Sequence, residues 1–200
     1  MHTNYIPPKR KTKVVFVQLG SPEAPTPKAL RKYLRNFLGD PRVIDIPAWK
    51  WKIILNCFVL PLRPARSAKL YERIWDGKSF PLITNTENFT NSVREELKKI
   101  DPEGYVEVNH AFLLSPPYVN EVYDSWEEDL KNNVGATKLM VIPMFPQYSE
   151  STIASGVDAL AKELSKRVKI PTFEVITNFH RTHAFIDNSV NQLDEKVEEL

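Results

Sequence analysis

Cysteine is nearly absent from this sequence, which contains one, Cys57, among 200 residues. A single thiol can form neither an internal disulfide framework nor a thiolate cluster for a metal, and it suits a reducing compartment. Long apolar runs are absent too, since no stretch approaches the roughly 18 apolar residues of a membrane-spanning helix. Residues 1–12 are a polar, basic leader with no apolar run of signal-peptide length behind it. We therefore expect a cytoplasmic protein.

An excess of charge of either sign is also missing. Lys and Arg number 27 against 25 Asp and Glu, which gives a formal net charge of +2. The basic residues are spread along the chain and form no recognition motif, so we expect no nucleic-acid partner. With 42% hydrophobic and 26% charged residues, the composition is that of a globular protein long enough to bury a core.

Motifs for phosphate, metal and acyl-transfer chemistry are missing as well. The segment "QLGSPEAPTP" matches neither the G-x-G-x-x-G pattern nor the P-loop, and its prolines remove backbone donors. Of the histidines, only His180 and His183 are close together, which leaves them short of a metal site. Composition permits a Ser/His/Asp triad, but there is no G-x-S-x-G nucleophile elbow. No general base stands out, and we expect no metal ligand and no bound cofactor in this chain.

What the sequence does contain is an alternation of apolar runs with amphipathic segments. The runs expected to be strands are residues 13–19, 105–114, 138–143 and 172–176. Helices are expected at residues 26–38, 67–74, 86–100, 117–131, 153–168 and 185–200. Thr26 and Thr86 are the expected first residues of two of these helices, and Val168 ends the apolar face of another. This alternation predicts an α/β fold with a parallel sheet that helices cover on both faces.

In such a sheet the ligand lies beyond the carboxyl ends of the strands. Leu19, Leu113, Phe145 and Tyr148 follow expected strands, as do several hydroxyl side chains. The hydroxyls are those of Ser21, Ser149, Ser151 and Thr152. Aromatic walls with a few hydroxyls suit a flat conjugated macrocycle better than a sugar or a phosphate. The alternative is that the hydroxyls only cap the helix that follows residue 152.

Three segments carry a family resemblance. The opening "KVVFVQLGSPEAPTPKALRKYLRNFLGDPRVIDIP" resembles that of ferrochelatases, in which an apolar strand precedes N-x-G-G-P-E. The segment "RPARSAKLYERIWDGKSFPLI" resembles their R-x-P-K-x-x-x-x-Y-x-x-I-G-G-x-S-P-L. The most specific match is "VIPMFPQYSESTIASG", which resembles their L-P-x-Y-P-Q-Y-S-x-S-T-T-G-S. The matches run in order across nearly the whole chain.

The resemblance implies a class II chelatase fold of two Rossmann-like domains that face a porphyrin cleft. Residues 13–170 would form the first domain, and residues 171–200 a crossover strand and helix that lead into a second domain. The implied activity is insertion of ferrous iron into protoporphyrin IX to give protohaem. The implied porphyrin-binding residues are Gln18, Leu19, Ser21, Arg63, Tyr71, Leu113, Tyr148, Ser149, Ser151 and Thr152.

The sequence also departs from the family pattern. The family's catalytic histidine, in S-x-H-(S/G)-(L/I/V)-P, and its essential glutamate have no counterpart here, so we expect this chain to be inactive without a C-terminal half on the same or a separate chain. Leu113 replaces an arginine that many members have, and Ser21 replaces a glycine. Two alternatives therefore stay open, a non-catalytic tetrapyrrole-binding or delivery module and a related chelatase for another metal.

Residues 49–62, "WKWKIILNCFVLPL", are the most apolar window of the chain. In ferrochelatases this region forms an apolar lip at the cleft mouth, and in some members it touches the membrane. Tryptophans beside lysines suit a headgroup interface, so we expect peripheral membrane contact here. The alternative is an ordinary core helix, for which the length of the run is suitable.

Overall fold

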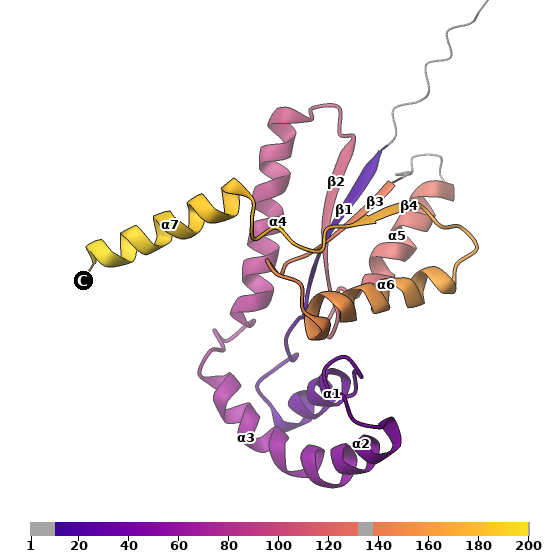
Figure 1. Ribbon diagram of the computed structural model, residues 1–200, viewed down its shortest axis with the longest axis vertical. Helices are drawn as coiled ribbons and strands as arrows, with labels where there is room; N and C mark the ends of the chain where they lie inside the picture. Colours follow the sequence, from indigo (N-terminus) through magenta and orange to yellow (C-terminus); the bar gives the residue numbers. More distant parts are fainter. Residues whose placement is uncertain (1–10, 132–137, 200) are drawn as a thin grey trace, which may run out of the picture.

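A computed structural model describes residues 11–131 and 138–199 (Figure 1). Most of the expected basic leader, residues 1–12, lies outside the described residues. The centre is a four-stranded sheet in the order β2-β1-β3-β4, with every neighbouring pair parallel. Its strands are β1 (Thr12–Gln18), β2 (Val106–Phe112), β3 (Lys138–Pro143) and β4 (Thr172–Val175). The predicted α/β fold with a Rossmann-like parallel sheet is confirmed.

Helices cover both faces of this sheet, as the alternating pattern predicts. Helix α4 (Pro81–Ile100) lies on one face, and α5 (Val119–Lys131) and α6 (Ser155–Ser165) lie on the other. A π-helical turn, η2 (Glu150–Ala154), leads directly into α6. The last helix, α7 (His183–Glu198), extends away from the sheet, and none of its residues is buried (Figure 1).

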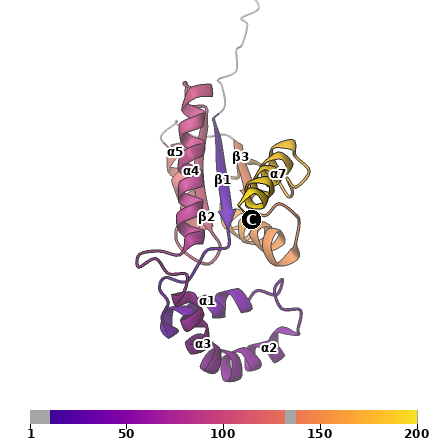
Figure 2. The same cartoon turned by 90° about the vertical axis from the view of Figure 1, so that its left-hand side faces the viewer.

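The connection from β1 to β2 contains a separate group of helices beyond the carboxyl ends of the strands (Figures 1 and 2). It comprises α1 (Pro27–Leu38), α2 (Ala48–Ile54), the π-helical turn η1 (Leu55–Val59) and α3 (Leu60–Glu72). We call residues 27–72 the helical lobe. Leu38, Leu55 and Leu60 form its own small core, with Trp51 packed against them.

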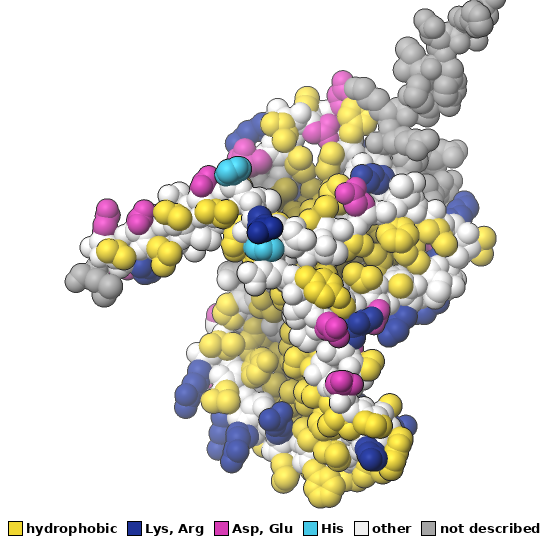
Figure 3. All heavy atoms as spheres, viewed as in Figure 1, with side chains coloured by type: hydrophobic (Ala, Val, Ile, Leu, Met, Phe, Trp, Pro, Cys, Tyr) yellow, Lys and Arg dark blue, Asp and Glu magenta, His cyan; other side chains and the backbone are white. Residues whose placement is uncertain are grey.

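The apolar window at residues 49–62 has two sides in this lobe. Leu55 and Leu60 are buried in its core, whereas Trp49 is 66% exposed and Phe58 is 62% exposed. Hydrophobic side chains accordingly gather over the lower part of the molecule, with Lys and Arg beside them (Figure 3). The core-helix interpretation therefore accounts for only part of the window.

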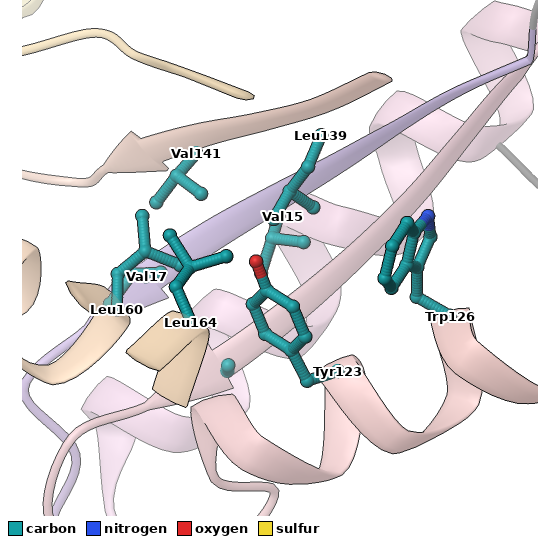
Figure 4. Close-up of a cluster of buried hydrophobic side chains, with 9 residues drawn as sticks. Val15, Val17, Tyr123, Trp126, Leu139, Val141, Leu160 and Leu164 are labelled. Atoms are coloured by element: carbon teal, nitrogen blue, oxygen red, sulfur yellow. The ribbon is translucent and has the colours of Figure 1, made fainter. Parts of the chain in front are cut away.

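Strand β1 supplies both main cores because successive side chains point to opposite faces. Val15 and Val17 pack with Tyr123, Trp126 and Leu160 beneath α5 and α6 (Figure 4). Val14 and Phe16 face α4. Burial on both faces explains why this strand is a continuous apolar run in the sequence.

Helix ends match the sequence in some places and differ in others. The hydroxyl of Thr26 accepts a hydrogen bond from the Ala29 amide at 3.3 Å and caps α1, as expected. The expected start at Thr86 is wrong, because α4 begins at Pro81 and the buried Thr86 hydroxyl donates to the Leu82 carbonyl instead. Val168 was expected on the apolar face of its helix, but α6 ends at Ser165 and Val168 is fully exposed.

Candidate functional site at the carboxyl ends of the strands

The segments that follow β1, β2 and β3 meet at one edge of the sheet. The Leu113 amide donates to the Gln18 carbonyl at 3.0 Å, and the Leu114 amide donates to the Leu19 carbonyl at 3.0 Å. On the other side of β1, the Met144 amide donates to the Val17 carbonyl at 2.8 Å. The backbones of the sequence-predicted residues Gln18, Leu19 and Leu113 are therefore brought together.

This edge is also the switch point of the sheet. Strand β1 lies between β2 and β3, so the connections that leave β1 and β3 diverge there. Open α/β sheets bind their ligands in the crevice that such divergence creates. The order β2-β1-β3-β4 thus points to the ends of β1 and β3 as the place for a ligand.

Gly20 sets the path of the chain just after β1. Its φ is +91°, and a Cβ atom there would lie 2.3 Å from the Ser115 hydroxyl oxygen. The neighbouring residue, Ser21, is buried, and its amide donates to that same hydroxyl at 3.3 Å. Ser115 thereby fixes the loop that carries Leu19 and Ser21. Sequence reasoning missed Ser115, and its only signal was its place in the predicted post-strand segment "LLSPP".

An aromatic wall connects the lobe to the end of β1. The Tyr33 hydroxyl of α1 donates to the Gly20 carbonyl at 3.5 Å, and its ring lies edge-on to Tyr71 of α3 at 6.2 Å. Tyr71 in turn lies 5.5 Å from Phe80, which is 4.6 Å from Trp75. Burial, together with Tyr71, raises the pKa of Tyr33 above its usual value, which favours the neutral hydroxyl that donates to Gly20. Tyr71, a sequence-predicted site residue, therefore lies in an aromatic cluster between α1 and the residues that precede α4.

The hydroxyl-rich turn after β3 forms a second wall. Ser149 is the N-cap of η2, yet its side chain makes no capping bond and instead lies 3.1 Å from the Ser151 hydroxyl. Thr152 and Ser155 donate to carbonyls of their own turn, at 3.4 and 3.3 Å. Capping thus fails to explain the Ser149–Ser151 pair. Tyr148, just before it, is 57% exposed. π-helical turns are frequent at functional sites.

The side chains of two predicted site residues lie outside these two walls. Arg63 is exposed on α3 of the helical lobe rather than at the strand ends. The Leu113 side chain packs against the core beneath α5 and α6. It also lines a cavity of about 400 Å³ together with Ser155 and Asp158 of α6.

Two histidines, His180 and His110, lie in different parts of the structure and make different contacts. The His180 amide donates to the Pro146 carbonyl at 3.1 Å, and its Nδ1 lies 3.2 Å from the same oxygen, so the loop after β4 is fastened to the loop after β3. His110 Nδ1 is buried without a hydrogen-bond partner, and desolvation lowers the pKa of this imidazole. Within residues 11–131 and 138–199, no group of three or more His, Cys, Asp or Glu could hold a metal ion.

A parallel sheet with a switch point, flanked by an aromatic and a hydroxyl wall, defines a class of α/β ligand-binding domains. Comparison with known families is more specific, because the family model described as Ferrochelatase matches residues 11–200. The chain therefore belongs to the ferrochelatase family.

Individual relatives agree with this assignment. The chain is 38% identical over 185 residues to a ferrochelatase of Idiomarina loihiensis, which covers 92% of this chain and 49% of the relative. It is 34% identical to a ferrochelatase of Marinobacter nauticus, covering 90% of the chain and 47% of the relative. A coproporphyrin III ferrochelatase of Streptococcus mutans is 38% identical, with 89% and 54% covered. The chain thus spans about half the length of these relatives.

Proposed function

We propose that this chain forms one wall of the porphyrin cleft of a ferrochelatase that inserts ferrous iron into protoporphyrin IX to give protohaem. The observation that carries the proposal is the hydrogen bond from Tyr33, whose ring contacts Tyr71, to the Gly20 carbonyl. Gly20 directly follows Gln18 and Leu19 at the switch point of a ferrochelatase-family sheet. The exposed Tyr148 follows the adjacent strand, β3. Aromatic faces and apolar side chains suit the flat ring, and hydroxyls suit its polar edge.

The role of the wall in this reaction is to position the ring. Metal insertion requires the two pyrrole N–H protons to leave while the metal approaches a ring held with little slack. The Ser149–Ser151 hydroxyl pair and Thr152 stand on a hydrogen-bonded π-helical turn, which supports a rigid placement. Ferrous iron and the porphyrin are substrates, and we assign no catalytic residue to this chain.

We propose that the opposite wall, with the general base, comes from a C-terminal half on the same or a separate chain. In support, the chain covers 49% of the Idiomarina loihiensis relative. The last helix, α7, also has a solvent-exposed apolar face. Its exposed members, spaced along one side of α7, are Ile186, Val190, Leu193 and Val197.

We propose that the exposed side of the lobe meets a membrane surface of a cytoplasmic enzyme. Among the described residues no helix is long and apolar enough to cross a membrane. Trp49, Phe58 and Leu62 are exposed beside many basic residues, while Glu72 is the one acidic side chain between residues 48 and 73. The basic residues of that segment are Lys50, Lys52, Arg63, Arg66, Lys69 and Arg73. Each cation near an anionic surface contributes about 1 kcal/mol.

Porphyrin titration of the 200-residue chain, followed by the Soret band, tests the function. We expect binding in about the micromolar range, since one wall alone buries one face of the ring. Tyr148→Ala and Ser151→Ala should weaken binding, whereas Ser165→Ala, an exposed hydroxyl at the far end of α6, should not. The absence of any Soret shift at high protein concentration would contradict the proposal.

The choice between two porphyrin substrates is tested by repeating the titration with coproporphyrin III and comparing the two affinities. One relative is named for coproporphyrin III, a ring with more carboxylates than protoporphyrin IX. Leu113 stands where many family members have an arginine, so this wall offers one cation fewer to such carboxylates. Tighter binding of protoporphyrin IX than of coproporphyrin III is the expected result, and the reverse order would transfer the assignment to coproporphyrin III.

A delivery module and a chelatase for another metal are the remaining alternatives. Insertion assays with the chain plus its C-terminal half separate them, because a delivery module would bind porphyrin without turnover. A chelatase for another metal would prefer that metal to ferrous iron.

A further inference from the structure

The helical lobe has a hydrophobic core of its own. Its core contains residues only from within the lobe and its loops, and none from the two clusters that flank the sheet. Figures 1 and 2 both show the lobe set apart beyond the strand ends. Because this core is separate from the two cores that flank the sheet, the angle between the lobe and the sheet depends on specific contacts between them. The Tyr33–Gly20 hydrogen bond and the Tyr71–Phe80 ring contact are two of these contacts.

A further contact between the lobe and the rest of the chain is a bidentate ion pair. Arg42, in the loop after α1, donates from Nε to Asp158 Oδ2 at 2.7 Å and from Nη2 to Asp158 Oδ1 at 3.1 Å. Asp158 lies on α6, which continues the π-helical turn of the hydroxyl wall. Within the part of the chain that the structure describes, no other ion pair joins the lobe to α6 or the sheet.

Both ends of the pair are held in place. The Arg42 amide donates to Asp40 Oδ1 at 2.8 Å, and the Val43 and Ile44 amides donate to the Asp40 carbonyl, so the loop is a closed turn. Asp158 is part of a regular helix. A bidentate guanidinium–carboxylate pair fixes orientation as well as distance, which a single contact does not.

We propose that Arg42 and Asp158 are positioning residues that fix the separation between the lobe, with Arg63 and Tyr71, and the Tyr148–Thr152 wall. The inference rests on the proposed function, since that separation is then the width of the porphyrin cleft on this side. The pair touches neither the ring nor the metal in this role. It acts by limiting how far the lobe can swing away from α6.

The charges around the pair are consistent with this role. Hydrogen bonding to Arg42 lowers the pKa of Asp158 below its usual value, so the pair is ionised at neutral pH. Glu150 and Tyr148, at the hydroxyl wall, also favour the charged form of Arg42 and raise its pKa, after the larger effect of Asp158. The two side chains are 36% and 38% exposed. Because exposed pairs are weak, we expect loss of the pair to lower porphyrin affinity only about three- to tenfold.

Distance measurement tests the positioning role without any porphyrin. Cys57, exposed on η1 of the lobe, is the only cysteine of the chain, and Ala161→Cys adds an exposed second site on α6. Spin labels on these two thiols should give a narrow distance distribution in the otherwise unchanged 200-residue chain. Arg42→Met and Asp158→Ala should broaden it, and Asp158→Glu, which keeps the carboxylate, should restore most of the narrow component.

A matched control uses another exposed pair that bridges two elements, Lys138–Glu174 between β3 and β4, at 37% and 47% exposure. Glu174→Ala removes a similar ion pair without touching the lobe, so the label distances should stay as in the unchanged chain. Equal distributions in all variants, or equal broadening by Glu174→Ala, would overturn the positioning role.

Porphyrin titration of the same variants gives the second readout. Arg42→Met and Asp158→Ala should weaken binding alike, and the double variant should be no weaker than either one. If Asp158→Ala leaves or strengthens binding while Arg42→Met weakens it, Arg42 is instead a direct ligand of a porphyrin carboxylate and our inference is wrong. If the unchanged chain binds no porphyrin, the proposed function fails, while the label distances still decide whether the pair positions the lobe.

Discussion

Gly20→Ala is the substitution for which the structure predicts the largest single effect at the site. At φ +91° an alanine has an unfavourable backbone, which costs about 1–2 kcal/mol. The new methyl would also lie 2.3 Å from Ser115 Oγ and 3.0 Å from Phe112 Cβ. Phe112 is fully buried and cannot move away, so overpacking adds about 1–3 kcal/mol.

The two contributions sum to about 2–5 kcal/mol, a large part of the 5–15 kcal/mol by which a typical domain is stable. Denaturant unfolding of the chain measures this loss as a change in midpoint at constant slope. Gly77→Ala is the matched control, because its φ is +95° but no heavy atom lies within 4 Å of the new Cβ. It carries the backbone cost and the unfolded-state effect of an added methyl, but no clash.

The difference between the two variants isolates the clash with the end of β2. We expect Gly20→Ala to be less stable than Gly77→Ala by about 1–3 kcal/mol. The double variant Gly20→Ala/Ser115→Ala should be more stable than the sum of its single changes predicts, because the nearest clashing oxygen is gone. Equal losses for Gly20→Ala and Gly77→Ala would refute the close packing of this loop.

Three further predictions follow from the same contacts. Trp49→Ser/Phe58→Ser should reduce co-sedimentation of the chain with anionic vesicles; equal, negligible pelleting of both forms would leave the lobe without a membrane role. The raised pKa of Tyr33 stabilises the fold below pH 10, and this contribution should be lost as pH rises above 10, through a higher folded pKa. Tyr33→Phe should therefore lose less stability between pH 10 and 12 than the unchanged chain, and parallel pH curves would contradict this. Finally, residues 1–200 alone should not insert zinc or ferrous iron into a water-soluble porphyrin anaerobically, because a general base contributes roughly 10²- to 10⁴-fold; turnover above the rate of free metal would place the chemistry in this half.

Much of the fold could be predicted from local sequence pattern. Strand β3 has the predicted bounds, residues 138–143, and the apolar run of β1 indicated burial on both faces. Where prediction was wrong, a tertiary contact overrode a local signal. Thr86 is a residue type that often begins a helix, and we expected a helix to start there. Phe80, however, is buried against Tyr71 and Trp75, and this packing sets the beginning of α4 at Pro81.

The candidate site could be predicted only in part from the sequence, because tertiary contacts bring some of its residues together. Gln18, Leu19 and Tyr148 follow strands directly, so the rule that parallel strands end at one edge brings them together. Ser115, Tyr33 and the Arg42–Asp158 pair carry no such signal. Asp158 is 116 residues from Arg42, and only the folded chain shows that they meet.

The strand-end floor of the site and the side that the lobe contributes differ in how firmly the fold holds them. Gln18 and Leu19 continue a strand whose neighbours bond to it on both sides, so the floor of the site cannot move without breaking the sheet. Tyr71 is on a lobe with its own core, which ring contacts, the Tyr33–Gly20 hydrogen bond and one ion pair connect to the rest of the chain. A rigid floor with an adjustable side suits a ligand that must enter, be held and then leave. Motion of the described chain should therefore be concentrated in residues 27–72 rather than in the sheet.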